Sequence, residues 1–459
     1  MSQATAVFVP PRPSPGAAVM NLLRVVLQGD GDLLTLVPRY AYRVRTGWLG
    51  WSRRSTLIVN DPAEVRRVLS DQGGIFPKSD LMVEALDPLI GDSIFTSSGA
   101  VWQRQRRMID PSLSMMRVNR AFPAMADGCA AMEAKLDEAA AENRPVSLDL
   151  TMSHLTADII CRTVFSTTLD SQVAHDVFDA FTLFERSVAQ VKIRRLIFDP
   201  AFKKVPQEAH VLEACRLIRA HLGDLLDTHL AAGAGYDDIC QQVIEARDLD
   251  TDTRFTREEL IDQLGVLFLA GHETSASALT WAFYLLASQP ALVARLRAEI
   301  EEVTGGGEIG FEHTRRLLVT RNVFRETLRL YPPITFLPRV AMEAATIGDH
   351  RVKRGALVMV APWVLHRHQS FWRDAHVFDP DRFLPEREAE MTAGAYIPFG
   401  IGPRVCAGAA FAQTEAILLI ARLFRRFDVQ IIDAGRVRPA ARLTTRPARQ
   451  VMMTLSRAR

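Results

Sequence analysis

A glycine-rich segment that ends in a cysteine is the part of this 459-residue chain best suited to chemistry. It reads FGIGPRVCAG over residues 399–408. The apolar pattern after it predicts a helix from about 407 to 427, so Cys406 lies at a helix N-terminus. Backbone N–H groups and the helix dipole favour a thiolate there, and Arg404 adds positive charge. A thiolate in this place can act as a nucleophile or as a metal ligand.

The two roles of Cys406 need different neighbours. A nucleophile requires a general base, and no histidine stands close to Cys406 in the sequence. A phosphatase-like loop would carry an arginine six residues after the cysteine, where this chain has Ala412. An inert buried thiol is a fair alternative for the cysteine alone, although it leaves the glycines, proline and arginine around it unexplained.

A long helix is predicted to open at Thr256, because Thr256 and Glu259 fit a capping box. It continues to about Ser288, before Pro290, and would be roughly 48 Å long. Its centre reads AGHET over residues 270–274. The glycine costs about 1 kcal/mol against alanine and lets another group approach the backbone. An acid beside a hydroxyl could pass protons to a ligand there. A packed helix with a local kink explains the segment equally well.

Two further pairs of residues share a helix face. Glu326 and Arg329 are three apart and can pair, although such pairs are usually solvated and contribute little. Trp102 and Arg106 are four apart, so a ring N–H and a cation project together and suit a carboxylate partner. For each pair, a helix face turned to solvent is the simpler interpretation.

The elements that must position these residues are mostly helices. Asp61 and Pro62 fit the cap and first residue of one helix. We therefore expect a mainly α fold with a small β portion. Strands are predicted within 48–60 and 346–360, helices over much of 115–230, and irregular structure over 73–98 and 379–388.

Composition restricts the class of protein further. Lys and Arg number 55 and Asp and Glu 53, a net charge of +2 that argues against a nucleic-acid partner. No apolar run reaches the length of a transmembrane segment and no secretory signal is expected. The five cysteines form no CxxC motif and are interpreted as reduced thiols of a cytoplasmic protein, neither a disulfide framework nor a structural zinc site: Cys129, Cys161, Cys215, Cys240 and Cys406. Residues 1–20 are expected to be an extended lead-in, and residues 21–459 one large domain.

Taken together, these motifs resemble the cytochrome P450 family of haem-thiolate monooxygenases. The cysteine loop matches the family pattern Phe-x-x-Gly-x-Arg-x-Cys-x-Gly at every fixed position. The order Trp-x-x-x-Arg, Ala-Gly-x-Glu-Thr, Glu-x-x-Arg and cysteine loop also agrees. The resemblance covers about residue 61 to the end of the chain. It implies the P450 fold, with haem between the long central helix and the cysteine loop and last helix.

The resemblance also implies roles for individual residues. Cys406 would be the thiolate ligand of the iron of haem b, as in that family. Glu326 and Arg329 would join Arg382 in a buried structural network, which overturns the solvated interpretation of that pair. The distal oxygen site would be lined by Gly271, Glu273 and Thr274. The other haem-binding residues would be Arg404, Trp102, Arg106, Arg339, Phe399, Gly400 and Gly408.

The implied activity is insertion of one oxygen atom from O2 into a C–H or C=C bond of a hydrophobic small molecule. Lipophilic side chains are expected to line the substrate pocket, namely Ile75, Phe76, Leu81, Leu267, Ala270, Ile334, Phe336 and Leu337. A basic run at Lys192, Arg194, Arg195, Lys203 and Lys204 could attract an anionic or membrane-borne substrate, but a solvated face is the simpler interpretation.

Electrons from NAD(P)H are expected to come through separate proteins, because no flavin or iron–sulfur motif is seen. Arg104, Arg107 and Arg404 suggest a positive surface for an acidic ferredoxin or flavodoxin, with its reductase. A peroxide-driven peroxygenase and a haem-binding sensor or carrier are the alternatives. The Glu273–Thr274 pair argues against both, since neither needs to activate O2 with reductant.

Overall fold

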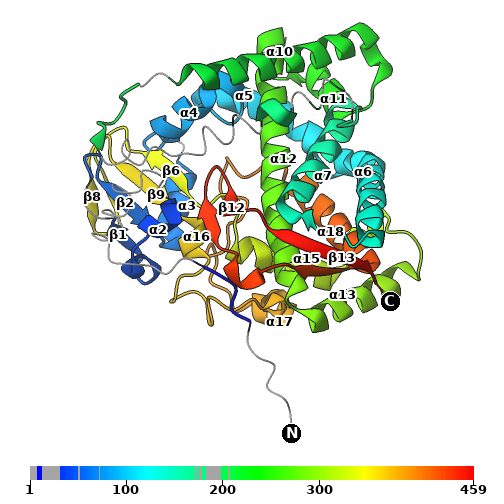
Figure 1. Ribbon diagram of the computed structural model, residues 1–459. Helices are drawn as coiled ribbons and strands as arrows, with labels where there is room; N and C mark the ends of the chain where they lie inside the picture. Colours follow the sequence, from blue (N-terminus) through cyan, green and yellow to red (C-terminus); the bar gives the residue numbers. More distant parts are fainter. Residues whose placement is uncertain are drawn as a thin grey trace.

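The longest helix, α12 (Arg257–Ala287), runs through the middle of the molecule in the computed structural model of the protein (Figure 1). The structure describes residues 8–12, 32–49, 52–71, 73–170, 172, 175, 178–181, 184, 198–204 and 207–458. The predicted capping box is confirmed, because Thr256 Oγ1 accepts from Glu259 N and Glu259 Oε2 accepts from Thr256 N. Apolar residues occur on all sides of α12, so it is buried along most of its length.

Other helices surround α12 and bury its apolar surface. They are α4 (Asp80–Ile90), α6 (Met115–Ala141), α7 (Leu148–Phe165), α10 (Ala209–Ala232), α13 (Pro290–Thr304), α15 (Leu318–Leu330) and α18 (Ala409–Arg426). Helix α7 packs closely on α12 at Gly271. A Cβ at residue 271 would lie 2.4 Å from Ile160 Cδ1, which is too close for two carbon atoms. The glycine in the centre of α12 therefore allows the close approach of α7.

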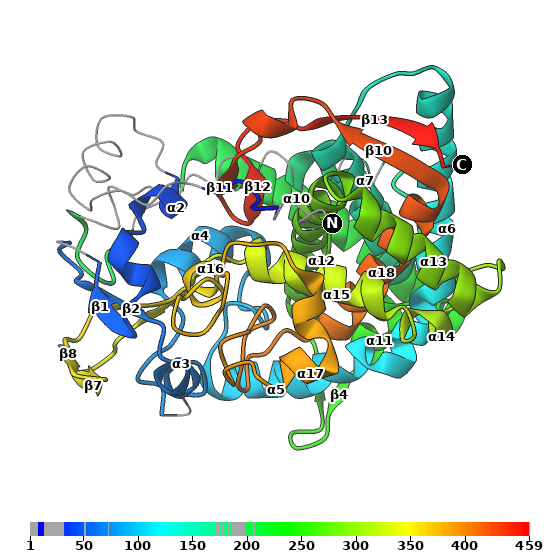
Figure 2. The ribbon, with the colours of Figure 1, turned by 90° about the horizontal axis from the view of Figure 1, so that it is seen from below.

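A four-stranded sheet lies at the side of the molecule opposite most of these helices (Figures 1 and 2). Its order is β1 (Thr46–Trp48), β2 (Thr56–Val59), β9 (Leu357–Val360) and β6 (Leu337–Val340). Strands β2 and β9 are parallel and the outer pairs are antiparallel. Every residue of β2 and β9 is buried, which explains their uninterrupted runs of mostly apolar residues. The predicted mainly α fold with a small β portion is confirmed.

Smaller elements complete the fold. The strands are β3 (Val146–Ser147), β4 (Arg247–Asp248), β5 (Thr253–Arg254), β7 (Ala345–Ile347), β8 (His350–Val352), β10 (Phe427–Ile431), β11 (Pro439–Ala441), β12 (Thr445–Pro447) and β13 (Met452–Arg457). The short helices are α2 (Leu33–Leu36), α3 (Pro62–Leu69), α5 (Gly99–Ile109), α11 (Ile239–Glu245), α14 (Phe311–Thr314), α16 (Pro362–Leu365) and α17 (Pro385–Glu388). The 3-10 turns are η1 (Arg39–Tyr42), η2 (Asp110–Leu113), η3 (Gly233–Gly235), η4 (Pro380–Phe383) and η5 (Ala434–Arg436).

Two segments predicted to be irregular contain helices. Residues 73–98 include α4, which continues through Pro88 and packs on α10 and α12. Burial against these helices outweighs the local turn signals of the proline and the flanking glycines. Residues 379–388 include η4 and α17. The prediction of irregular structure was wrong over most of residues 379–388, and within 73–98 it was wrong over the eleven residues of α4.

The N-terminal segment 8–12 lies against the domain. The Tyr331 hydroxyl donates to the Pro11 carbonyl at 2.6 Å, and Phe378 N donates to the Phe8 carbonyl at 3.1 Å. The rest of the predicted lead-in, residues 1–7 and 13–20, lies outside the described residues, so the division of the chain at residue 20 stays a prediction. Within the described ranges, no single helix is long and apolar enough to cross a membrane. Helices α12 and α13 reach that length and composition only together, with a bend of 110° between them.

Candidate active site

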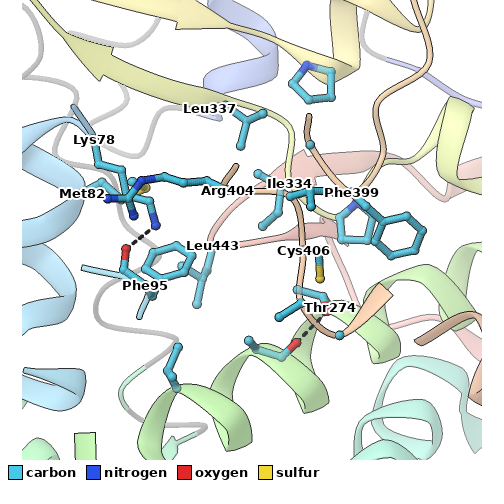
Figure 3. A pocket seen from close by; sticks show the side chains of 18 of the residues that line it. Lys78, Met82, Phe95, Thr274, Ile334, Leu337, Phe399, Arg404, Cys406 and Leu443 are labelled. Atoms are coloured by element: carbon cyan, nitrogen blue, oxygen red, sulfur yellow. Dashed lines mark hydrogen bonds between the residues drawn. The ribbon is translucent and has the colours of Figure 1, made fainter. Parts of the chain in front are cut away.

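A cavity of about 560 Å³ lies between α12 and the loop of residues 399–408. Helix α4, strand β6 and the β11–β12 hairpin supply the other walls. Figure 3 shows the Cys406 side chain pointing toward α12, where Thr274 lies, and Lys78, Phe95 and Arg404 gathered to one side. The cavity therefore brings together the cysteine loop and the AGHET segment, which are far apart in the sequence.

The cysteine loop is held in one conformation by its glycines and backbone. Gly402 has φ +79°, and a Cβ there would lie 2.5 Å from Ser70 Oγ and 3.0 Å from the Leu69 carbonyl. Cys406 N donates to the Phe399 carbonyl at 2.9 Å. Helix α18 begins three residues after the cysteine, close to the predicted start. Only glycine fits at residue 402, since any side chain would collide with α3 and its C-cap.

Cys406 lines the cavity and is exposed, unlike the other four cysteines, which are buried. Burial raises the pKa of its thiol above the ordinary value, although the Gly408 N–H and the charge of Arg106 act in the opposite direction. The helix N-terminus alone therefore does not produce the thiolate that the sequence suggested. A thiol with a raised pKa is a poor nucleophile, whereas a bound metal deprotonates it directly.

Three cations lie beside this cavity without a carboxylate partner. Within the described part of the chain, no ion pair involves Lys78, Arg339 or Arg404, and all three line the cavity. The Arg404 guanidinium lies 4.4 Å from the centre of the Trp102 ring, and its Nη2 donates to the Ser97 carbonyl at 2.8 Å. Its Nη1 is buried and has no hydrogen-bond partner. Such a cluster would be stabilised by a bound anion.

Burial and the closeness of these cations lower the pKa of all three groups. Burial, and then the charge of Arg404, lower the pKa of Arg339 to about 10, with Asp71 acting in the opposite direction. Burial and the charge of Arg106 lower the pKa of Arg404 to about 10. Burial and the two arginines lower the pKa of Lys78 well below its ordinary value. The Lys78 ammonium donates to the Phe95 carbonyl and lies 3.7 Å from the centre of the Phe95 ring.

These residues fit haem, which the resemblance implies. Haem needs an axial ligand for its iron and cationic partners for two propionate groups. Cys406 can supply the axial ligand, and the unpartnered Arg404 Nη1 can donate a hydrogen bond to a propionate. Arg106 also lines the cavity, although it already pairs with Asp110 at 2.7 Å and donates to the Val405 carbonyl. The other predicted haem-binding residues that line the cavity are Trp102, Arg339, Phe399, Gly400 and Gly408.

Lys78 was missed by sequence reasoning. It follows Pro77 in a segment that was predicted to be an irregular loop, where a lysine is normally solvated. Nothing in the local sequence indicates that its side chain is enclosed between the arginines and Phe95. Only the packing of distant segments shows that Lys78 belongs to the cationic cluster.

The AGHET segment presents some of its side chains to the cavity. Ala270, Gly271 and Thr274 line it, and so does Ser275, the residue after the segment. Thr274 Oγ1 donates to the Ala270 carbonyl at 2.7 Å, so its hydroxyl stays at the cavity wall.

Glu273 does not line the cavity, so the prediction that it does was wrong. It accepts from Arg446 Nε at 2.8 Å and from Thr444 Oγ1 at 2.5 Å. Burial alone would raise the pKa of Glu273, but Arg446, with His272 and Thr444, lowers it well below its ordinary value. Glu273 is therefore ionised and held against the β11–β12 hairpin.

Glu326, Arg329 and Arg382 meet in the interior. Arg329 Nε lies 2.6 Å from Glu326 Oε2, and Arg382 Nε lies 3.3 Å from Glu326 Oε1. Arg329 also donates to three backbone carbonyls, of His366, Ala375 and Val377. The interpretation of Glu326 and Arg329 as a solvated pair is wrong, because neither side chain is exposed.

Six of the eight predicted pocket residues line the cavity: Leu81, Leu267, Ala270, Ile334, Phe336 and Leu337. Ile75 and Phe76 do not, and this part of the prediction was wrong. Their side chains pack with the apolar residues beneath the sheet. Backbone hydrogen bonds hold the segment there: Phe76 N donates to Asp71 Oδ2 at 2.6 Å, and Met342 N donates to the Ile75 carbonyl at 2.9 Å. Met82 and Phe95, from the segment 73–95 that was expected to form part of the wall, also line the cavity, and Leu443 lines it without having been predicted.

The positive surface expected for a redox partner is largely neutralised. Arg104 pairs with Glu259 at 2.6 Å, and Arg107 pairs with Asp248 at 2.8 Å. Arg404 belongs to the cavity. The acidic partners reduce the positive charge that Arg104 and Arg107 add to the surface, and a positive docking surface stays a prediction. Of the predicted basic run, Lys192, Arg194 and Arg195 lie outside the described residues, and Lys203 pairs with Asp199 at 3.1 Å.

Comparison with known proteins agrees with this geometry. The family model "Cytochrome P450" matches residues 10–454. Cyclooctatin synthase of Streptomyces melanosporofaciens is 32% identical over 85% of this chain and 84% of its own length. Pentalenene oxygenase of Streptomyces avermitilis is 27% identical over 86% of each chain. The protein LUTEIN DEFICIENT 5 of Arabidopsis thaliana is 31% identical over 86% of this chain and 69% of its own.

Solved structures show the same fold. The crystal structure of the cytochrome P450DA heme domain superimposes with a TM-score of 0.83 over 98% of each chain, at 22% identity. The structure of a cytochrome P450 named CYP102L1 gives a TM-score of 0.80 over 99% of this chain. Taken with the cysteine loop and its cavity, these matches show that the chain belongs to the cytochrome P450 family and is a haem-dependent monooxygenase.

Proposed function

We propose that this enzyme inserts one oxygen atom from O2 into a C–H or C=C bond of a carbocyclic, largely hydrocarbon small molecule. The observation that carries the proposal is the aliphatic wall of the cavity beyond Cys406. Leu81, Met82, Leu267, Ile334, Leu337 and Leu443 supply this wall. Such a surface binds a substrate by excluding water and offers few hydrogen bonds. The names pentalenene oxygenase and cyclooctat-9-en-7-ol 5-monooxygenase point to substrates of this kind in two relatives.

Haem b is the form of cofactor that the site favours. When bound, haem supplies the chemistry that activates O2 and oxidises the substrate. Cys406 would hold its iron, while Lys78, Arg339 and Arg404 would hold its propionates. Among the described residues, Cys406 is the only cysteine that lines the cavity, so no second thiol is placed to attach the macrocycle covalently. Thr274 presents a hydroxyl that can hold or pass a proton at the cavity wall.

Electrons would come from NAD(P)H through a separate ferredoxin or flavodoxin and its reductase. The described residues contain no group of three or more His, Cys, Asp or Glu side chains that could hold a second metal centre. A cytoplasmic location is consistent with cysteines that form no disulfide in the described part of the chain.

Substrate binding and turnover test this proposal. Carbocyclic hydrocarbons and their alcohols, beginning with pentalenene, are added to the ferric enzyme and binding is followed by the optical spin shift. Turnover is then run with NADPH and a surrogate ferredoxin and reductase under ¹⁸O2. The proposal expects one ¹⁸O atom in the product. Leu267→Trp should abolish the spin shift by filling the cavity, whereas Leu249→Trp should not, since Leu249 is 91% exposed.

Two other results would contradict the proposal. Product formed with peroxide but never with reductant and O2 would indicate a peroxygenase. Stable haem binding with no turnover of any compound would indicate a sensor or carrier.

A further inference from the structure

Arg442 is a cation at the wall of the cavity, in the turn between β11 and β12. Its backbone N–H donates to the Thr444 carbonyl at 3.0 Å, which closes the turn. Its side chain lines the cavity and is exposed, and within the described residues its guanidinium takes part in no hydrogen bond or ion pair. The N–H donors of this side chain are therefore available to a ligand.

The turn between β11 and β12 has a fixed position on the molecule. Ser277 Oγ and Trp281 Nε1, both on α12, donate to the Thr445 carbonyl at 2.8 and 2.7 Å. On the other side of the turn, Ala441 N donates to Asp32 Oδ1 at 2.8 Å. The backbone of the turn is therefore held at the cavity from both sides, whereas the arginine side chain in it can turn toward a ligand.

The charges along the cavity do not balance. Among the described residues that line it there is no carboxylate, and there are five cations: Lys78, Arg106, Arg339, Arg404 and Arg442. Arg106 pairs with Asp110 at 2.7 Å. Lys78, Arg339 and Arg404 form the cluster that would hold the two haem propionates. Arg442 is left without a counter-ion among the described residues, and a cleft with surplus positive charge attracts an anion.

The surface next to Arg442 is aliphatic. Leu443, the following residue of the turn, lines the cavity together with Ile334 and Leu337 (Figure 3). A ligand that suits both features has an apolar body and one anionic end. A carboxylate fits the arginine, because its two oxygens match the guanidinium fork and its single charge balances one cation. A diphosphate would bring more negative charge than Arg442 can balance.

We propose that Arg442 selects substrates that carry a carboxylate group. The guanidinium binds this group at the hairpin, and the carbocyclic part of the molecule lies along the aliphatic wall toward Cys406. Arg442 thereby determines which molecules bind and how they are oriented, and it takes no part in oxygen transfer. This inference rests on the proposed function, since it narrows the substrate class of the same cavity.

Binding of paired ligands tests the inference. Adamantane-1-carboxylic acid and abietic acid, each with its methyl ester, are titrated into the ferric haem-loaded enzyme at about pH 7.5, where the acids are ionised. Dissociation constants are taken from the optical spin shift. We expect each acid to bind more tightly than its ester. Arg442→Gln should weaken binding of the acids about tenfold or more, the effect of losing one charge-assisted contact, and leave binding of the esters unchanged.

Arg438→Gln is the matched control, because Arg438 lies just before β11, donates to the Gly435 carbonyl at 2.8 Å and does not line the cavity. It should bind the acids as the wild type does. Arg442→Lys should recover part of the lost affinity, since lysine keeps the charge without the guanidinium fork. Acids that bind the wild type no more tightly than their esters, or equal weakening of acids and esters by Arg442→Gln, would overturn the inference.

The outcomes also separate this inference from the proposed function. Binding and turnover of the esters without binding of the acids would remove the role of Arg442 and leave the proposed reaction standing. An acid preference that depends on Arg442, with no ¹⁸O in any product, would support the carboxylate site and contradict the proposed reaction. The absence of a spin shift with all four compounds would overturn the carboxylate inference.

Discussion

The Glu273 carboxylate faces Arg446, with Arg446 Nε 2.8 Å from Glu273 Oε1, and it is turned away from the cavity that Thr274 lines. Glu273 and Thr274 are adjacent in the sequence but therefore occupy different environments. Arg446 belongs to β12, the returning strand of a hairpin whose tip, Arg442 and Leu443, also lines the cavity. The position of Glu273 thus depends on a strand that is itself next to the substrate site.

Replacing Arg446 should destabilise the protein through Glu273. Arg446→Met leaves a buried carboxylate without its cation, which should lower the free energy of unfolding by about 3–5 kcal/mol. Urea unfolding measures this change. The double variant Glu273→Gln/Arg446→Met should recover much of the loss, because no uncompensated charge remains. If the double variant is as unstable as the single one, Arg446 acts through packing and not through the charge of Glu273.

Replacing Cys406 should change the haem spectrum without preventing the fold. Cys406→Ser substitutes a weak oxygen ligand for the thiolate, so the red-shifted band of the ferrous carbonyl complex should disappear. Cys161→Ser is the control, because Cys161 is buried in α7 and does not line the cavity. An unchanged carbonyl spectrum in Cys406→Ser would show that another residue holds the iron.

Much of this site could be predicted because its parts are short sequence motifs. The cysteine loop, the AGHET segment and the Glu326–Arg329 pair each act over a few residues, so spacing alone places their members together. The capping box of Thr256 and Glu259 was predictable for the same reason, since both partners lie in one helical turn.

The contacts that were missed join distant segments. Glu273 and Arg446 are 173 residues apart, and Ser275 and Glu415 are 140 apart. Whether a polar side chain faces a cavity or a partner depends on which helix or hairpin packs beside it. Ile75 and Phe76 illustrate the same limit, because two apolar residues near the cavity wall could equally join the core beneath the sheet, and they do.

Removing the charge of Lys78 should weaken haem binding and leave the fold intact. Lys78→Met deletes one member of the cationic cluster, and a charge-assisted contact is worth about 1.5–3 kcal/mol, so haem affinity should fall at least about tenfold. The haem-free protein should be no less stable, because its most enclosed unpaired amine is gone. Haem titration and thermal unfolding of the haem-free protein measure the two effects.

Lys203→Met is the matched control for the cationic cluster, since Lys203 is half-exposed and pairs with Asp199. If Lys78→Met and Lys203→Met bind haem equally well, Lys78 is not part of the propionate site.

The buried network around Glu326 should be far more sensitive than a surface ion pair. Glu326→Gln leaves Arg329 and Arg382 facing each other with less compensation, and a loss of about 3–5 kcal/mol in the free energy of unfolding is expected. Asp381→Asn breaks the half-exposed pair of Asp381 with Arg295, which should cost less than about 1 kcal/mol. Chemical unfolding of the two variants side by side provides the measurement. Similar losses in the free energy of unfolding would mean that the buried Glu326 network stabilises the protein no more than a surface ion pair does.

The ion pair of His229 with Asp238 should make stability depend on pH. His229 Nε2 lies 2.8 Å from Asp238 Oδ2, and the pair ties α10 to α11, whose N-terminus Asp238 caps. Burial alone would lower the pKa of His229, but the hydrogen bonds to Asp238 and the Leu225 carbonyl raise it above its ordinary value of 6.5. The folded state therefore binds this proton more tightly than the unfolded state.

The stabilising contribution of His229 should be fully present below pH 6.5 and lost as the pH rises through the raised pKa of the folded state. His229→Gln should therefore lower Tm more at about pH 6 than at about pH 9, measured against wild type at each pH. His210→Gln, an exposed position on the same helix, should show no such difference. If the Tm deficit of His229→Gln is the same at both pH values, the histidine stabilises the helix junction as a neutral ring, through packing against Tyr236 at 4.1 Å between ring centres.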